Sequence, residues 1–351
     1  MSDHPQAVPG ASSYARLAAR RLGWLIAGAL VLVISAIVDI LTGPAFLSVD
    51  QVLTGLFAPS EVDQTTAVIV RQIRLPMTLM AILVGVALGI AGVAMQTILG
   101  NPLASPYTLG FSAAAGFGAA LAIITGLSVP LLPWMTIPVA AFVAASLAGV
   151  LVYGFAHRKG MTPDVMVLAG IATLFLFQSL QSMVQYLASP EVLQAIVFWL
   201  FGSLLKSNWD NVPITAAIVI VCTALLVPDA WRLTALRLGD MRAASLGVEV
   251  ERLRVKVFVL VALLTAGSVA FVGTIGFVGL VAPHIARMLV GEDQRFLMPM
   301  SALAGACIMT GASILSKMIS PGSVIPIGIV TAVIGVPFLF GLILRLKGNR
   351  S

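Results

Sequence analysis

Few side chains in this sequence combine a reactive type with a position that would support chemistry. Asp39 and His284 fall within apolar stretches, where ionisable groups often mark a proton or ion pathway. Each stands alone, and His284 is flanked by Pro283 and Arg287. An isolated histidine of this kind is more often a hydrogen-bonded structural residue than a relay, so we assign it no catalytic role.

The sequence contains no nucleotide-binding or metal-hydrolase motif. None of its lysines follows a glycine, which excludes the phosphate-binding pattern GxxxxGK[ST], and HExxH is absent as well. Cys222 and Cys307 lie in apolar stretches, far from a second Cys or His at ligand spacing. We therefore predict no enzymatic site, no metal site and no cofactor bound by this chain.

One stretch carries several amide side chains along a single helical face. In FQSLQSMVQYL, residues 177–187, the polar positions are spaced by three, four and seven: Gln178, Gln181, Ser182 and Gln185. An amide stripe facing lipid would be costly. It must face another helix, where amides hydrogen-bond across the interface, or water.

The composition predicts that the elements around these residues lie in a membrane. Hydrophobic residues make up 59% of the 351 and charged residues 10%, against about a quarter charged in soluble domains. The apolar runs reach roughly 18 residues, enough to cross a bilayer. They lack the alternation of a transmembrane barrel. We predict an all-α integral membrane protein with about ten helices, near 22–42, 70–99, 108–126, 134–156, 165–187, 211–228, 255–273, 275–290, 299–316 and 325–344.

The distribution of basic residues predicts the orientation. With a cytoplasmic N-terminus, all but four of the 20 Lys and Arg residues lie inside; the four outside are Arg71, Arg74, Lys206 and Lys317. This bias is the positive-inside rule, so both termini are predicted to be cytoplasmic. Residues 1–15 are rich in Ala, Ser, Pro and Gly and are predicted to be a disordered tail, and 16–351 a single transmembrane domain. The net charge of +6 follows from this bias and does not indicate nucleic acid.

The longest charged segment is WRLTALRLGDMRAASLGVEVERLRVK, residues 231–256. Gly239 and Gly247 bracket good helix formers, and Asp240 is placed to cap a short helix between them. We predict a helix lying across the inner face of the membrane. A solvated loop that merely obeys the positive-inside rule is an equally weighted alternative.

Four stretches together resemble the FecCD-type permeases, the transmembrane subunits of ATP-binding-cassette importers for ferric siderophores, haem and cobalamin. LGDMRAASLGV, residues 238–248, resembles the segment that couples these permeases to their ATPase. Residues 74–116, 273–291 and 325–340 match in the same order and spacing. The resemblance covers nearly all of the chain from about residue 40 to 345, and it implies a cobalamin-permease-like bundle.

The resemblance implies several partners. Two permease chains, identical or sibling, form a pair around a central pathway in the bacterial inner membrane. Two ATPase subunits bind ATP and Mg²⁺ on the inner side, and a periplasmic binding protein delivers the ligand. The residues implied to seat in the ATPase groove are Leu238, Gly239, Asp240, Arg242, Ala244, Leu246 and Gly247. No nucleic acid is implied.

The resemblance also implies roles for residues at both ends of the pathway. Arg74 and Lys317 match basic positions that dock the binding protein, although Met77 stands where a third basic residue is typical. The residues implied to form a cytoplasmic gate are Asn101, Leu103, Thr162 and Pro163, in two Pro-containing loops. An ordinary helix-ending turn is the alternative for these loops, and a residue reaching toward the interface is the alternative for Arg74.

In the family the helix with the amide stripe borders the central pathway, which favours pathway residues over helix-to-helix contacts for Gln178, Gln181, Ser182 and Gln185. We expect a ferric siderophore as the substrate, then haem, then cobalamin. A stand-alone secondary transporter, or a membrane subunit that does not transport, remains a rival. The sequence does not determine the chelate, the identity of the second chain or the resting conformation.

Overall fold

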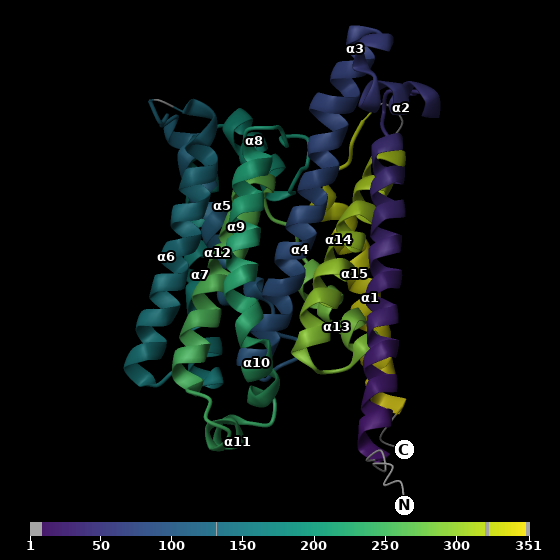
Figure 1. Ribbon diagram of the computed structural model, residues 1–351. Coiled ribbons are helices and arrows are strands. Elements are labelled where there is room, and N and C mark those ends of the chain that lie inside the picture. Colours follow the sequence, from purple (N-terminus) through teal and green to yellow (C-terminus); the bar gives the residue numbers. More distant parts are fainter. Residues whose placement is uncertain (1–8, 131, 320–322, 349–351) are drawn as a thin grey trace, which may run out of the picture.

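The computed structural model describes residues 9–130, 132–319 and 323–348, and in this part of the chain all regular structure is helical (Figure 1). The α-helices are α1 Pro9–Leu41, α2 Val49–Phe57, α3 Gln64–Val68, α4 Leu75–Ile98, α5 Phe111–Thr125, α6 Thr136–Lys159, α7 Pro163–Leu187, α8 Pro190–Leu200, α9 Asn211–Leu226, α10 Ala230–Leu236, α11 Asp240–Ser245, α12 Val250–Val272, α13 Val278–Val290, α14 Gln294–Met318 and α15 Ile327–Gly348. The prediction of an all-α protein is confirmed.

Each of the predicted apolar ranges contains a helix. Within the described residues, seven continuous helical segments are long and apolar enough to cross a membrane, and the shorter apolar stretches are α5, α8, α13 and residues 327–341 of α15. Helix α8 has no counterpart among the predicted ranges. Of the predicted tail, residues 1–8 lie outside the described residues, and α1 begins at Pro9, before the expected boundary at residue 16.

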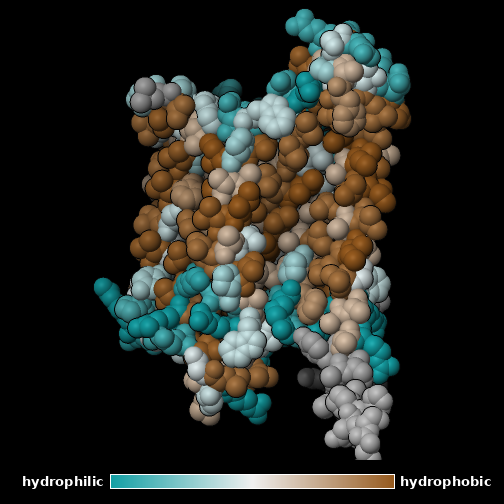
Figure 2. All heavy atoms as spheres, viewed as in Figure 1, coloured by the Kyte–Doolittle hydropathy of each residue, from teal (hydrophilic) through white to brown (hydrophobic). Residues whose placement is uncertain are grey.

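The surface of the bundle matches a membrane protein. Figure 2 shows a broad hydrophobic band around the middle of the molecule, with hydrophilic residues gathered at both ends. Helix α1 begins, and α15 ends, at the end of the bundle that also carries α11 (Figure 1). This is the arrangement expected when the two ends and the charged segment 231–256 lie on the same side, which the charge bias predicts to be the cytoplasm.

Helix α4 is the centre of the bundle. Most of its residues are buried, and α14, α12 and α13 pack around it. Glycines allow backbones to meet there: a Cβ on Gly92 would overlap the carbonyl oxygen of Gly279, and one on Gly85 would overlap that of Gly305. In lipid, helix association depends on such close contact between small residues.

Three helix breaks lie together and satisfy one another's backbone groups. The chain between α12 and α13 is unwound, the nitrogen of Ser203 donates to the carbonyl of Val272 at 2.7 Å, and the nitrogen of Ile327 donates to that of Gly202 at 3.0 Å. Thr274 donates its hydroxyl to the carbonyl of Leu200. Irregular backbone is tolerated within a membrane only where protein groups pair with it, so these breaks depend on one another.

Candidate functional site: the α11 segment and the adjoining loops

The predicted helix in the segment 231–256 is present as α11. Gly239 (φ 96°) and Gly247 (φ 83°) flank it with positive φ, a conformation that glycine adopts without the cost it has for other residues. Ala243 and Val248 are buried and anchor it to the bundle. The residues predicted to face an ATPase groove are all exposed: Leu238, Gly239, Asp240, Arg242, Ala244, Leu246 and Gly247.

The exposed side of α11 is unusually apolar for a polar end of the molecule. Leu238, Met241 and Leu246 are 54%, 86% and 51% exposed, respectively. An apolar patch of this kind surrounded by polar residues is typical of a protein-interaction surface. A merely solvated loop would not need these side chains to point outward, so the structure favours a docking surface.

Asp240 does not cap α11, contrary to the sequence-based expectation. Gly239 occupies the N-cap position, with no side-chain cap hydrogen bond. The Asp240 carboxylate instead accepts two hydrogen bonds from Arg254 of α12, at 2.6 and 2.7 Å. A bidentate guanidinium–carboxylate pair is stronger and more directional than a cap, so the carboxylate is drawn toward α12.

Arg254 connects α11 to two loops. Its side chain is 6% exposed. Besides Asp240 it donates to the carbonyl of Ile98, the last residue of α4, at 3.1 Å and to that of Met161, in the loop before α7, at 3.2 Å. One buried side chain therefore joins the exposed helix to the starts of both predicted gate loops.

The predicted gate residues lie in those loops. Asn101 and Leu103 are exposed, and the Asn101 side chain accepts a hydrogen bond from the Leu103 nitrogen at 2.9 Å, which closes the turn. Thr162 is exposed and Pro163 begins α7. Both are turns that end or begin a helix, as the alternative reading expected. Thr162 also lines a cavity of about 360 Å³ together with residues of α11.

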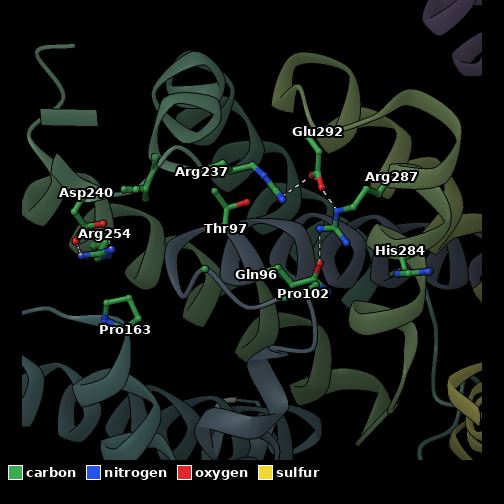
Figure 3. Close-up of a pocket in the computed structure, with 13 residues that line it drawn as sticks. Gln96, Thr97, Pro102, Pro163, Arg237, Asp240, Arg254, His284, Arg287 and Glu292 are labelled. Atoms are coloured by element: carbon green, nitrogen blue, oxygen red, sulfur yellow. Dashed lines mark hydrogen bonds and ion pairs between the residues drawn. The ribbon is translucent and has the colours of Figure 1, made fainter. Parts of the chain in front are cut away.

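A second cavity, of about 390 Å³, separates the two loops from α13. It is lined by Gln96, Thr97, Gly100, Pro102, Pro163, Leu236, Arg237, Gly239, Asp240, Arg254, His284, Arg287 and Glu292 (Figure 3). Glu292 accepts from Arg237 at 2.7 Å and from Arg287 at 3.0 Å. Burial lowers the pKa of Arg237. The negative charge of Glu292 raises this pKa, and the positive charge of Arg287 lowers it further.

The amide stripe lies on α7, on a side that this chain leaves largely open. Gln178 and Ser182 are exposed, and Gln181 and Gln185 are half-buried. The side-chain oxygen of Gln181 lies against Gly116 of α5, so this residue contacts a neighbouring helix. Large apolar residues of α7, including Phe175 and Tyr186, are exposed beside the stripe.

Arg74 and Lys317, predicted to dock a partner, are buried. Arg74 donates to the carbonyls of Ile40, Leu41 and Ala45. Lys317 donates to the carboxylate of Asp39 at 2.8 Å, and Thr78 donates to the same carboxylate at 2.5 Å.

Both basic side chains are thus engaged within the chain, where they fasten α1 and the segment after it to α4 and α14. Their charge is not presented to a partner in this conformation. Docking through them stays a prediction that this arrangement does not favour.

The residues that connect the helices at the α11 end of the bundle were missed in the sequence analysis. Gln96 and Thr97 interrupt the apolar run of α4, and Gln294 opens α14 and donates to Thr97 at 2.7 Å. Polar residues this close to the end of an apolar run were the available signal. Arg254 was counted only toward the charge bias. In the described part of the chain, no group of three or more His, Cys, Asp and Glu residues is arranged to hold a metal ion.

Comparison with known proteins gives a consistent result. The model of the FecCD transport family matches residues 31–345. The Fe(3+)-citrate import system permease protein YfmE of Bacillus subtilis is 39% identical over 319 residues, covering 90% of this chain and 92% of that protein. The molybdate import system permease protein MolB of Haemophilus influenzae is 37% identical over 322 residues, covering 91% and 94%. A solved inward-facing metal-chelate type ABC transporter is 34% identical, covers 92% of this chain and 98% of that one, and superposes with a TM-score of 0.81.

Proposed function

The chain belongs to the FecCD transport family of ABC importer permeases, and on that premise we propose that it carries an iron chelate across the bacterial inner membrane. ATP and Mg²⁺ bind on two separate ATPase subunits, and a periplasmic binding protein delivers the chelate. A second permease chain, identical or sibling, packs against the open side of α7. The pathway then runs along the interface, past Gln178, Gln181, Ser182 and Gln185.

The observation that carries this proposal is the set of contacts made by Arg254. An ATPase that grips Leu238, Met241 and Leu246 moves α11 as a body. The Asp240 carboxylate is hydrogen-bonded to Arg254, and Arg254 is hydrogen-bonded to the carbonyls of Ile98 and Met161. A movement of α11 is therefore transmitted through Arg254 to both gate loops. A stand-alone secondary transporter has no use for an exposed apolar helix joined to its gate in this way.

The substrate is proposed from related permeases and from the neutral pathway. Relatives are named for Fe(3+)-citrate, hemin, cobalamin and molybdate. Amides without a fixed charge suit a large polar chelate that must pass without binding tightly. An iron chelate, such as a ferric siderophore, is therefore our first choice, followed by haem and cobalamin.

Transport in liposomes tests the proposal. The permease, its ATPase and its binding protein are reconstituted, and uptake of ⁵⁵Fe-labelled siderophore is compared with uptake of haem and cobalamin. We expect uptake that requires ATP and the binding protein and that a protonophore leaves unchanged. Uptake that persists without the ATPase subunits would instead establish a secondary transporter.

A further inference from the structure

The cavity of about 390 Å³ between the gate loops and α13 contains more positive than negative charge. Three guanidinium groups line it, from Arg237, Arg254 and Arg287, against two carboxylates, from Asp240 and Glu292. Asp240 and Arg254 pair with each other. Glu292 is shared between Arg237 and Arg287, so one positive charge on this wall has no counter-ion among the lining residues.

Two buried donors on the same wall also lack acceptors. Arg287 donates through Nε to Glu292 and through Nη2 to the Gln96 oxygen at 2.8 Å, which leaves Nη1 buried without a partner. Gln96 is 2% exposed, and its Nε2 has no partner either. A flip of this amide would not help, because it would turn a donor toward Arg287. Neither donor therefore has an acceptor within hydrogen-bond distance, and a buried donor without one is costly.

We propose that this cavity is a binding site for a phosphate group. An anionic group in the cavity would bring acceptor oxygens to the wall that carries Arg287 Nη1 and Gln96 Nε2, and would balance the unpaired charge beside Arg237. Guanidinium groups bind phosphate through paired, charge-assisted hydrogen bonds. The volume lies within the range of small-molecule sites, about 300–1,000 Å³, so the phosphate can be free or part of a larger molecule.

Because of its position, a ligand bound in this cavity would affect the arrangement of the gate loops and α11. Gly100 and Pro102 of one gate loop, Pro163 beside the other and Gly239 at α11 all border the cavity. A ligand held between elements that move relative to one another favours one of their arrangements. This consequence rests on the proposed function, whereas phosphate binding itself does not.

Two sources supply the same chemistry at this end of the bundle: free phosphate from the cytosol and the headgroup of an anionic lipid. Binding of ³²P-orthophosphate to the full chain is measured in phosphatidylcholine nanodiscs at constant ionic strength, and then in nanodiscs containing phosphatidylglycerol. Competition by phosphatidylglycerol assigns the site to a headgroup. Unchanged affinity assigns it to the free anion, and either result supports the site.

Substitutions give the decisive comparison. Arg287→Gln should weaken phosphate binding at least about tenfold, the loss of one charge-assisted contact. Arg252→Gln is the matched control, because Arg252 loses the same charge but is 83% exposed and outside the cavity. It should change the affinity less than about twofold.

Gln96→Glu tests the charge argument while keeping the contact to Arg287, although it replaces the Nε2 donor with a second carboxylate oxygen. The new carboxylate would still accept from Arg287 and would supply the missing negative charge, so phosphate binding should be lost while the melting temperature rises. Absence of saturable phosphate binding in phosphatidylcholine nanodiscs, or binding that survives in the Gln96→Glu protein, would overturn the proposal. Transport is not measured in these experiments, so the proposed function is unaffected by their failure.

Discussion

Arg254 and Asp240 form a bidentate pair in which the arginine is buried and the aspartate is half exposed, with side-chain exposures of 6% and 50%. The pair spans the boundary between the bundle and the exposed surface of α11. The buried partner also holds the carbonyls of Ile98 and Met161. The two residues therefore contribute unequally, because the loss of Asp240 leaves a buried charge, whereas the loss of Arg254 releases a carboxylate into water.

The first prediction follows from this asymmetry. Asp240→Ala should cost about 2 kcal/mol of stability, since it removes the counter-ion of a buried guanidinium, and should uncouple ATP hydrolysis from uptake. The exchange Asp240→Arg with Arg254→Asp should not restore coupling, because an aspartate at 254 cannot donate to the two carbonyls. The ratio of ATP hydrolysed to chelate taken up measures the effect. Normal coupling in the exchanged protein would show that the carbonyl contacts are dispensable.

The second prediction concerns the gate loop. In a chain with Cys222 and Cys307 replaced by Ala, Leu103→Cys should react with an impermeant maleimide from the cytoplasmic side, because Leu103 is 51% exposed. The rate should change severalfold when the ATPase binds ATP, in keeping with a rigid-body switch. Adding Asp240→Ala should remove that change.

Arg158→Cys is the control for gate labelling, since Arg158 is exposed at the end of α6 and lies outside both gate loops. Its labelling rate should not respond to ATP. An equal ATP response at positions 103 and 158 would argue against a local gate.

The third prediction concerns packing around α4. Gly92→Ala should destabilise the protein by about 3 kcal/mol, because the added methyl group overlaps the backbone of Gly279. Gly154→Ala is the matched control: this glycine of α6 has open space around its Cβ position, so the substitution should be neutral or stabilise by up to about 1 kcal/mol. Thermal unfolding in detergent measures both. Similar melting temperatures for the two proteins would contradict the packing argument.

The fourth prediction separates a structural from a docking role for Lys317. Lys317→Met should cost about 3–5 kcal/mol, because it leaves the carboxylate of Asp39 buried without its counter-ion. The double substitution Lys317→Met with Asp39→Leu should recover most of this loss, as measured by thermal unfolding. Affinity for the binding protein should be normal in the double variant. Affinity that stays low despite recovered stability would support docking through Lys317.

The fifth prediction addresses the amide stripe. Gln178→Leu should reduce chelate uptake by about tenfold, the equivalent of one lost hydrogen bond in the pathway, without lowering the melting temperature, since Gln178 is exposed in the single chain. Ser179→Ala, an exposed neighbour off the stripe, should leave uptake unchanged. A drop in stability with unchanged uptake would identify the stripe as a helix-to-helix contact.

Local sequence properties were enough to predict the membrane class, the positions of the apolar helices and the helix bracketed by Gly239 and Gly247. Hydrophobic length, charge bias and glycine conformation act within a few residues, so a sequence displays them directly. The exposed apolar side chain of Met241 belongs to this same short helix. Helix α8 was missed because its 11 residues are too few for a spanning run.

Only the tertiary structure decided which polar residues meet. Lys317 and Asp39 are 278 positions apart, and Arg254 joins carbonyls that belong to two other segments, at Ile98 and Met161. The ion-pair and hydrogen-bond partners of a polar residue in a membrane bundle depend on which helices cross and on where glycines allow them to approach closely. Both depend on the packing of the whole bundle. A basic residue near a helix end therefore has the same local sequence pattern whether it faces a partner protein or pairs with a buried carboxylate. Only the tertiary fold determines which of these two contacts it makes.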